Sequence, residues 1–268
     1  MAVVCTVSAT LLAALSLSLR EIQKRAYQVD QSRQMLQAAA ILDHQGHRLE
    51  EFLPEKRKRK KATDGEVMTL YQRRIRPILV DERGNRSNFE EQSLSLSHYL
   101  KRYEGEGYAH LPWKILYEIL SSEGKERVVG YILPIFGFGL WNSIHGYLAV
   151  GGDGNTILGT TWYKHEETPG LGANITLPQW QKSFVGKKIF QPDGQGYVDL
   201  ESASMGIHLI KGGVQRLPPH SSKREVSVDG IPGATLTSQG VMQAYKHSLT
   251  PYRYFFIRMQ KEREGESL

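Results

Sequence analysis

The stretch Asp229–Thr235 places a threonine hydroxyl directly after two small residues, where a helix is predicted to begin. Gly233 and Ala234 leave room for a bulky group to approach the backbone, and Gly233 can adopt a positive φ in a tight turn. The free N–H groups and the dipole of a first helical turn favour an anion. A phosphate esterified to Thr235 would therefore be well placed.

A helix is predicted to follow this threonine because apolar side chains recur at roughly helical spacing in residues 239–249, at Val241, Met242, Tyr245 and Leu249. Thr237 and Ser238 are good N-cap residues and are expected to open this helix. Thr250-Pro251 is expected to end it. An ordinary turn followed by a Ser/Thr helix cap is the alternative that so short a pattern leaves open.

A second candidate ligand loop is the segment Glu167-Thr168-Pro169-Gly170-Leu171-Gly172. Thr168 and exposed backbone N–H groups can bind the carbonyl and nitrogen atoms of a ring, and Leu171 can cover an apolar ring face. The glycines allow close approach of the backbone. The alternative is a surface turn containing Pro-Gly.

These segments resemble a known family. Asp229–Thr235 nearly matches the pattern D-x-x-(S/T)-G-A-T, on whose last threonine FMN is installed through a phosphodiester bond, although Pro232 stands where the pattern has Ser or Thr. Four other segments match the family and occur in its order along the chain. They are Gly137–Trp141, Gly146-Tyr147, the Glu167–Gly172 loop with His165-Glu166 before it, and Lys211–Gly213. Over roughly residues 130–245, the chain thus resembles the C subunit of the Na+-translocating NADH:quinone reductase.

The resemblance implies a flavoprotein subunit with no complete active site of its own. Thr235 would be the covalent FMN acceptor. A separate magnesium-dependent flavin transferase would use FAD, with the Thr235 oxygen as nucleophile and AMP as leaving group. Eleven further residues are expected to bind the cofactor: Gly233, Ala234, Leu236, Thr237, Ser238, Glu167, Thr168, Leu171, Gly172, Trp141 and Lys211.

The implied partners are the other subunits of a six-subunit complex that oxidises NADH, reduces ubiquinone and exports Na+. Electrons would pass one at a time from the FMN of this chain toward the flavin of the B subunit. Two alternatives remain. The G subunit of the Rnf-type ferredoxin:NAD oxidoreductase shares the motif but is shorter, and a binding module outside the cytoplasm that carries no flavin is favoured by Pro232 alone.

Several other chemistries find little support in the sequence. Cys5 is the only cysteine, which excludes an intrachain disulfide, a Cys-rich zinc site and a Cys-ligated iron–sulfur cluster within this chain. The nine histidines lack metal-ligand spacing, so no metal site is expected. Gly137-Phe138-Gly139 is too short for a dinucleotide fingerprint. His165 could relay a proton or be a hydrogen-bonded loop residue, and Trp141 could border the flavin or pack in the core.

The first nineteen residues carry no charge and are about long enough to span a bilayer as a helix. A retained anchor is favoured over a secretory signal peptide, because no basic region precedes it and no A-x-A site occurs before Arg20. We expect the chain to begin within this helix. The basic residues Arg20, Lys24 and Arg25 would place the domain in the cytoplasm by a simple positive-inside count. The family orientation instead implies a single pass through the bacterial inner membrane, with the FMN domain in the periplasm.

The net charge of +6 is local. Lys56–Lys61 contributes six positive charges in one run, so the rest of the chain is close to neutral. No aromatic residues interleave this run, and it is flanked by residues typical of loops. Binding of anionic lipid or nucleic acid and a nuclear-import signal are the alternatives for such a run. We expect a solvated loop and no nucleic-acid partner.

The coarse pattern predicts an α+β fold with a twisted, mainly antiparallel sheet and flanking helices. A helix is predicted over 19–41, loops around a short element at 75–80, and strands at 128–135, 144–150, 156–163 and 207–210, with a hairpin loop at 151–155. The expected organisation is a transmembrane helix at 1–19, a membrane-proximal helix and charged loops at 20–95, and an FMN-binding domain at 96–268.

Overall fold

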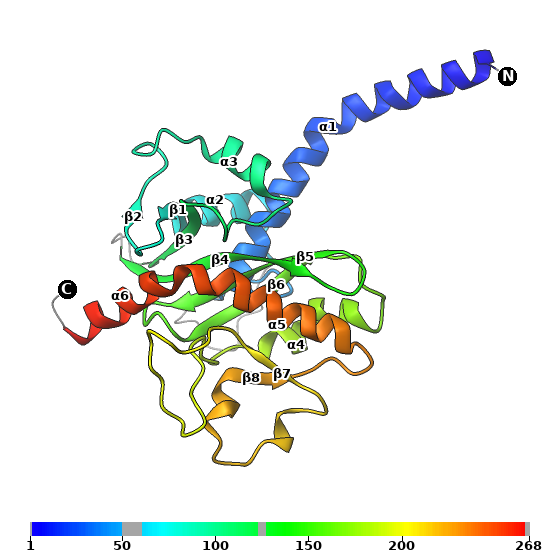
Figure 1. Cartoon of the computed structure of the whole chain (residues 1–268). Coiled ribbons are helices and arrows are strands. Elements are labelled where there is room, and N and C mark those ends of the chain that lie inside the picture. Colours follow the sequence, from blue (N-terminus) through cyan, green and yellow to red (C-terminus); the bar gives the residue numbers. More distant parts are fainter. Residues whose placement is uncertain (1, 50–60, 123–126, 266–268) are drawn as a thin grey trace.

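The computed structural model describes residues 2–49, 61–122 and 127–265. Its centre is a six-stranded antiparallel sheet in the order β2-β1-β3-β4-β5-β6 (Figure 1). The α+β class and the antiparallel sheet predicted from the sequence are confirmed. The hairpin predicted around residues 151–155 is also confirmed and joins β5 to β6. The strands are β1 (Ile75–Val80), β2 (Arg86–Ser87), β3 (Lys114–Leu120), β4 (Val128–Phe138), β5 (Ser143–Gly151) and β6 (Ile157–Lys164).

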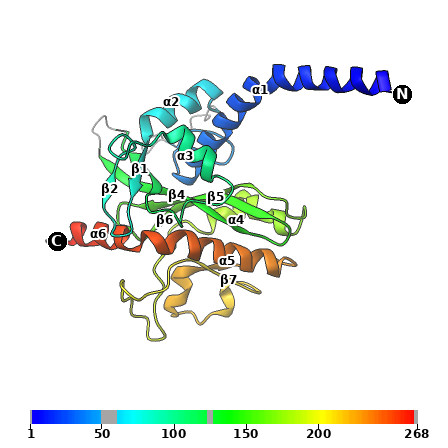
Figure 2. The same ribbon diagram turned by 45° about the horizontal axis from the view of Figure 1, so that its top comes forward.

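Two helices near the C-terminus, α5 (Thr235–Leu249) and α6 (Arg253–Glu264), cover one face of the sheet (Figure 2). The core on this face contains fully buried side chains from both helices and from the strands, including Leu148, Val241 and Phe256. α5 ends before Pro251 as predicted. The chain then makes a short 3-10 turn and enters α6, which the sequence patterns did not predict.

Small residues bring α5 into backbone contact with the end of β4. A Cβ atom built on Gly240 would lie 2.1 Å from the carbonyl oxygen of Phe138, and one built on Gly137 would lie 2.5 Å from the Cβ of Ala244. Separations below 3.0 Å require something to move. Glycine at these two positions therefore allows the N-terminal half of α5 to lie directly on the end of the strand.

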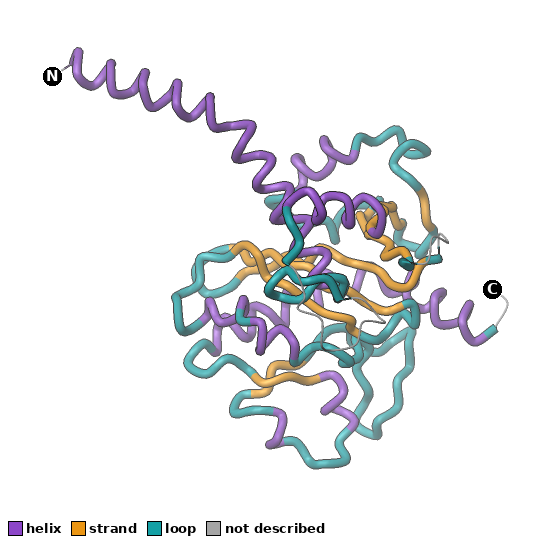
Figure 3. Tube along the Cα trace, turned by 180° about the vertical axis from the view of Figure 1, so that it is seen from behind, coloured by secondary structure: helices purple, strands orange, loops and turns teal. Residues whose placement is uncertain are grey.

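The opposite face of the sheet is covered by the C-terminal part of α1 (Ala2–Ala38) together with α2 (Asp64–Arg74) and α3 (Leu96–Tyr103) (Figure 3). Leu36 and Val67 are fully buried there against strand residues such as Ile115. The helix predicted over residues 19–41 is thus the second part of α1, which ends three residues earlier than expected.

The first half of α1 projects away from the rest of the molecule (Figure 1). Where their burial is described, its large apolar side chains are exposed, and Val29 is the first described residue of the helix that is buried. By length and composition, the span Val4–Ala38 contains a window apolar enough to cross a membrane. This confirms an apolar N-terminal helix and is weak support for an anchor.

The remaining elements are short, and of these β7 and β8 lie in the lower part of the molecule in Figure 1. A short parallel pair, β7 with β8, is an addition to the antiparallel pattern. These elements are η1 (Gly172–Thr176), α4 (Pro178–Lys182), β7 (His208–Ile210), η2 (Val214–Arg216), η3 (Ser222–Val226) and β8 (Ser227–Asp229).

The division of the chain after residues 19 and 95 remains a proposal. β1 and β2 precede residue 96 but are hydrogen-bonded members of the same sheet as β3. Of the basic run, residues 56–60 lie outside the described residues. Lys61, the last of the run, forms an isolated antiparallel bridge with His47.

Candidate functional site

One buried carboxylate joins three segments that are far apart in the sequence. Glu167 is only 4% exposed. Its Oε1 accepts a hydrogen bond of 3.1 Å from the backbone N–H of Trp141, and its Oε2 accepts one from the hydroxyl of Thr237 in α5. The Trp141 indole also donates a 3.1 Å hydrogen bond to the hydroxyl of Thr168. The structure therefore brings the 167–172 loop, the end of β4 and the start of α5 together.

Two glycines make room for this carboxylate. A Cβ atom on Gly139 would lie 2.4 Å from Oε1 of Glu167, and one on Gly172 would lie 2.3 Å from its Oε2 and 2.6 Å from the hydroxyl oxygen of Thr237. The predicted role of Gly172 was to let a ligand approach the backbone. The close approach seen here is made by the side chains of Glu167 and Thr237. This glycine therefore leaves space for the contact between them.

Thr235 is exposed and is the first residue of α5. The N-cap residue is Ala234, which makes no side-chain capping hydrogen bond. The expectation that Thr237 and Ser238 cap the helix is therefore wrong, because the helix begins two residues before the first of them. The Ser238 hydroxyl instead accepts a 3.1 Å hydrogen bond from the N–H of Ile231, which closes the turn that precedes the helix.

The first turn of α5 presents unused hydrogen-bond donors. Among the described residues, no protein group accepts a hydrogen bond from the N–H of Thr235, Leu236 or Thr237. These groups carry the positive end of the helix dipole. The exposed threonine hydroxyl thus lies at a place that favours an anion, as the sequence predicted.

Exposed apolar side chains come from each of the segments that meet here. Gly233 has the predicted positive φ, of 76°, and a Cβ atom on it would lie 2.9 Å from a methyl group of Leu171. Leu171 is 44% exposed, Leu236 58% and Trp141 66%. Trp141 is therefore not packed in the core, and the interpretation of this residue as core packing is wrong.

Two further exposed side chains at the end of β4 were not chosen from the sequence. Phe138 is 65% exposed and Leu140 is 49% exposed. Both flank Gly139, whose close approach to Glu167 places them beside the site. The Gly-Phe-Gly-Leu-Trp segment resembles a family motif, but only its tryptophan was predicted to bind the cofactor. The sequence signal that could have found the others is the presence of large apolar residues beside glycines at the end of a strand.

The first residue of the threonine motif anchors the loops around it. The carboxylate of Asp229 accepts a 2.6 Å hydrogen bond from the N–H of Val214, and its carbonyl accepts one of 3.0 Å from the indole of Trp180. Lys211 follows β7 and lies next to Gly230, whose N–H donates to the carbonyl of Ile210 at 3.0 Å. Lys211 is thus brought to the motif, and its exposed side chain makes no contact with Thr235 among the described interactions.

His165 has a structural partner. Its Nδ1 accepts a 3.2 Å hydrogen bond from the N–H of Glu167, which fixes the ring within the loop. This agrees with the interpretation as a hydrogen-bonded loop histidine. Across the part of the chain that the structure describes, no group of three or more His, Cys, Asp or Glu residues could hold a metal ion.

The segments that meet here lie within a domain of the FMN-binding class, because the family model of the FMN-binding domain matches residues 139–250. The chain is 39% identical to the C subunit of the Na+-translocating NADH-quinone reductase of Chlamydia muridarum, over 99% of this chain and 92% of the relative. It is 36% identical to the same protein of Chlamydia trachomatis, over 94% and 88%.

A crystal structure of the corresponding protein from Parabacteroides distasonis superposes with a TM-score of 0.60 at 26% identity, covering 89% of this chain and 96% of that one. The chain therefore belongs to the family of the C subunit of the Na+-translocating NADH-quinone reductase. The resemblance inferred from the sequence motifs is confirmed.

Replacing Glu167 with leucine is expected to lower the free energy of unfolding by about 2–4 kcal/mol, because two donors at a buried position lose their acceptor. Urea denaturation followed by circular dichroism measures this change. Glu166→Leu is the matched control. Glu166 is exposed, and its substitution removes the same charge one residue away. Equal effects of the two substitutions would show that Glu167 does not tie the three segments together.

Proposed function

We propose that this chain is a membrane-anchored flavoprotein subunit of a Na+-translocating NADH:ubiquinone reductase and that it carries FMN covalently on Thr235. The observation that carries the proposal is the exposed Thr235 hydroxyl at the N-terminus of a 15-residue helix, beside three N–H groups that have no acceptor among the described residues. Membership of the family and the match to the FMN-binding domain support it.

The residues present fit an FMN group. The N–H groups of the first turn of α5 would bind its phosphate. Leu171, Leu236 and Trp141 offer exposed apolar surface suited to an aromatic ring system. Thr168, which is exposed, and Lys211 would supply polar contacts. When bound, FMN supplies electron transfer in single-electron steps.

Other proposed site residues act through their neighbours. Glu167 and Thr237 hold the segments together from below, and Gly172 provides the space for their contact. Gly233 and Ala234 form the turn into the helix, and Ser238 closes that turn. We assign these residues to positioning the Thr235 hydroxyl and the apolar side chains around it.

Attachment requires an acceptor that an external enzyme can reach. In the proposed reaction with FAD, the Thr235 oxygen forms a bond to the phosphorus of the FMN part, the phosphoanhydride bond to AMP breaks, and the hydroxyl proton passes to the flavin transferase with AMP as leaving group. The chain itself contributes the nucleophilic oxygen. Exposure of Thr235 supports this, because the transferase must enclose the hydroxyl.

In the assembled complex, this chain would accept electrons derived from NADH and pass them toward the B subunit for ubiquinone reduction coupled to Na+ export. The apolar N-terminal helix would span the bacterial inner membrane once, with the FMN domain in the periplasm. A covalent link suits that location, because a carrier outside the cytoplasm cannot replace a lost cofactor from the cytoplasmic pool.

The purified complex containing Thr235→Val tests the electron-transfer role. We expect NADH oxidation with an artificial acceptor to persist. Ubiquinone reduction should fall by more than about tenfold, because the variant has no hydroxyl to carry FMN. A tenfold loss corresponds to about 1.4 kcal/mol in the barrier. Stopped-flow absorbance with NADH measures both. Ubiquinone reduction at the wild-type rate would contradict the role of this chain as an electron carrier.

A further inference from the structure

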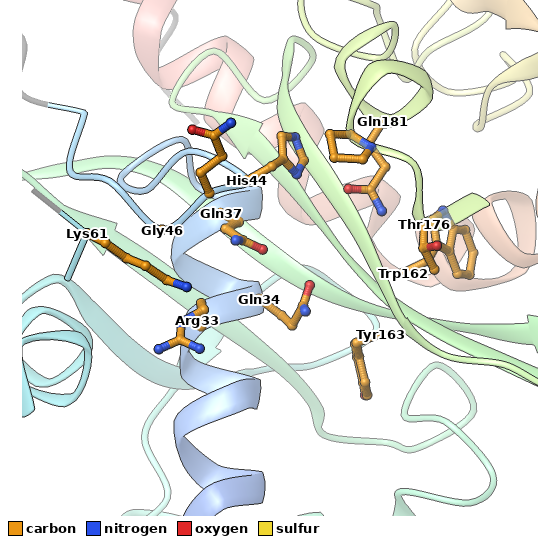
Figure 4. A pocket seen from close by; sticks show the side chains of 12 residues that line it. Arg33, Gln34, Gln37, His44, Gly46, Lys61, Trp162, Tyr163, Thr176 and Gln181 are labelled. Carbon is orange, nitrogen blue, oxygen red and sulfur yellow. The ribbon is translucent and has the colours of Figure 1, made fainter. Parts of the chain in front are cut away.

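A concave region that Thr235 does not line lies at the β6 edge of the sheet. It is a cleft of about 420 Å³ between the C-terminal part of α1, the loop around His44, and the segment from Thr176 to Gln181 (Figure 4). Arg33, Gln34 and Gln37 extend from α1, and Lys61 reaches toward Arg33 from the side. The flavin site described above does not use this cleft.

The lining of the cleft is basic. Arg33 and Lys61 both line it, and among its described lining residues none is acidic. The carboxylate that contacts Arg33 among the described residues is that of Asp64, at 2.8 Å, and Asp64 is 76% exposed and outside the lining. The local charge therefore favours an anion.

Arg33 also has an unused donor. Its Nε is buried and has no hydrogen-bond partner among the described residues. A buried donor of a charged group that lacks an acceptor is unfavourable by an amount comparable to a lost hydrogen bond. An anionic oxygen in the cleft would satisfy it. The guanidinium is well suited to phosphate because its donors are arranged in a planar fork.

The polar walls are held in place by the protein. The side-chain amide of Gln37 donates to the carbonyl of Asp43 at 3.2 Å, and that of Gln181 donates to the carbonyl of Ile175 at 3.1 Å. Their amide oxygens remain to accept from hydroxyl or amino groups of a ligand. A site built this way needs little rearrangement when a ligand binds.

We propose that this cleft binds the phosphate group of a small polar molecule, with Arg33 and Lys61 as its cationic ligands. The volume is several times that of a phosphate ion and lies within the range of small-molecule sites. The remainder of the ligand would contact the glutamine amides and the ring of Tyr163.

A phosphate group could belong to a soluble molecule or to a lipid headgroup. Arg33 lies fourteen residues beyond Leu19, where the uncharged N-terminal segment ends, which is about 20 Å along a helix at 1.5 Å per residue. A headgroup of the bilayer that holds the anchor would have to leave the membrane surface to reach it. The position therefore favours the soluble source.

Isothermal titration of the full chain in neutral detergent with inorganic phosphate, at constant ionic strength, tests the site. Lys61→Gln should weaken phosphate binding about tenfold, the loss expected for one charge-assisted hydrogen bond. Asp64→Asn should strengthen binding about threefold, because it frees Arg33 from its partner. Lys101→Gln removes an exposed charge on α3 and should leave binding unchanged.

The same variants are then compared on vesicles of phosphatidylglycerol and phosphatidylcholine. Binding of inorganic phosphate that depends on Lys61 assigns a soluble ligand, and binding to phosphatidylglycerol alone that depends on Lys61 assigns a headgroup. The proposed site would be overturned if neither phosphate nor vesicles bound. Equal affinities of Lys61→Gln and the wild type, or equal losses in Lys61→Gln and Lys101→Gln, would also overturn it.

Discussion

A chain with valine at position 235 is expected to carry no covalent flavin when it is produced together with a flavin transferase. The substitution removes the hydroxyl at nearly constant volume, and Thr235 is exposed, so the fold should be retained. Fluorescence of the denatured protein in a gel measures the label directly. We expect the wild-type band to fluoresce and the Thr235→Val band to be dark.

Two further variants isolate the chemistry of this hydroxyl. Thr235→Ser keeps a hydroxyl and should retain label. Thr237→Val removes the buried hydroxyl that donates to Glu167, and any flavin that remains should still map to Thr235. A fluorescent Thr235→Val band would remove Thr235 as the acceptor, and label found on Thr237 would move the assignment by two residues.

Gly240→Ala is expected to lower the free energy of unfolding by about 1–3 kcal/mol, the usual range for overpacking. The new Cβ would lie 2.1 Å from the Phe138 carbonyl, so α5 must move away from β4. Helix propensity alone predicts the opposite sign, because alanine stabilises a helix relative to glycine by about 0.5–1 kcal/mol. Urea denaturation distinguishes the two.

Gly65→Ala is the matched control for this prediction. Gly65 lies in α2, and a Cβ there would meet nothing within 4 Å. We expect this variant to be as stable as the wild type or more so, by the propensity difference alone. If Gly240→Ala were equally stable, the backbone contact between α5 and β4 would not constrain the position of Thr235.

Local patterns were sufficient to predict β4, β5 and β6. Residues 128–135 and 144–150 combine apolar and β-branched side chains, and the glycine-rich loop at 151–155 predicted their antiparallel neighbour. β3 and α6 were missed. Lys114 and Glu118 in β3 are buried charged residues, which a search for apolar runs does not recognise as strand.

The position of the helix caps could not be predicted because it depends on a distant contact. Thr237 has the local chemistry of an N-cap, but its hydroxyl donates to Glu167, seventy residues earlier. The turn before α5 is closed by Ser238, which allows the helix to begin at Thr235. A local motif identifies the candidate acceptor, whereas the contacts that position it are set by the fold.

The motif also could not show which neighbours are exposed. Trp141 has the composition of a core residue at the end of a strand. Its backbone N–H is fixed to Glu167 and its indole to Thr168, which holds the ring at the surface. This exposure follows from the packing of Gly139 against the buried carboxylate, which is a three-dimensional feature.

Intact-mass spectrometry of the chain produced with a flavin transferase, followed by peptide mapping, tests the central claim most directly. We predict a mass increase equal to one FMN residue, located on Thr235 in the peptide that contains Gly233 and Ala234. An unmodified chain, or an increase located on another residue, would contradict the assignment of this threonine as the covalent flavin site.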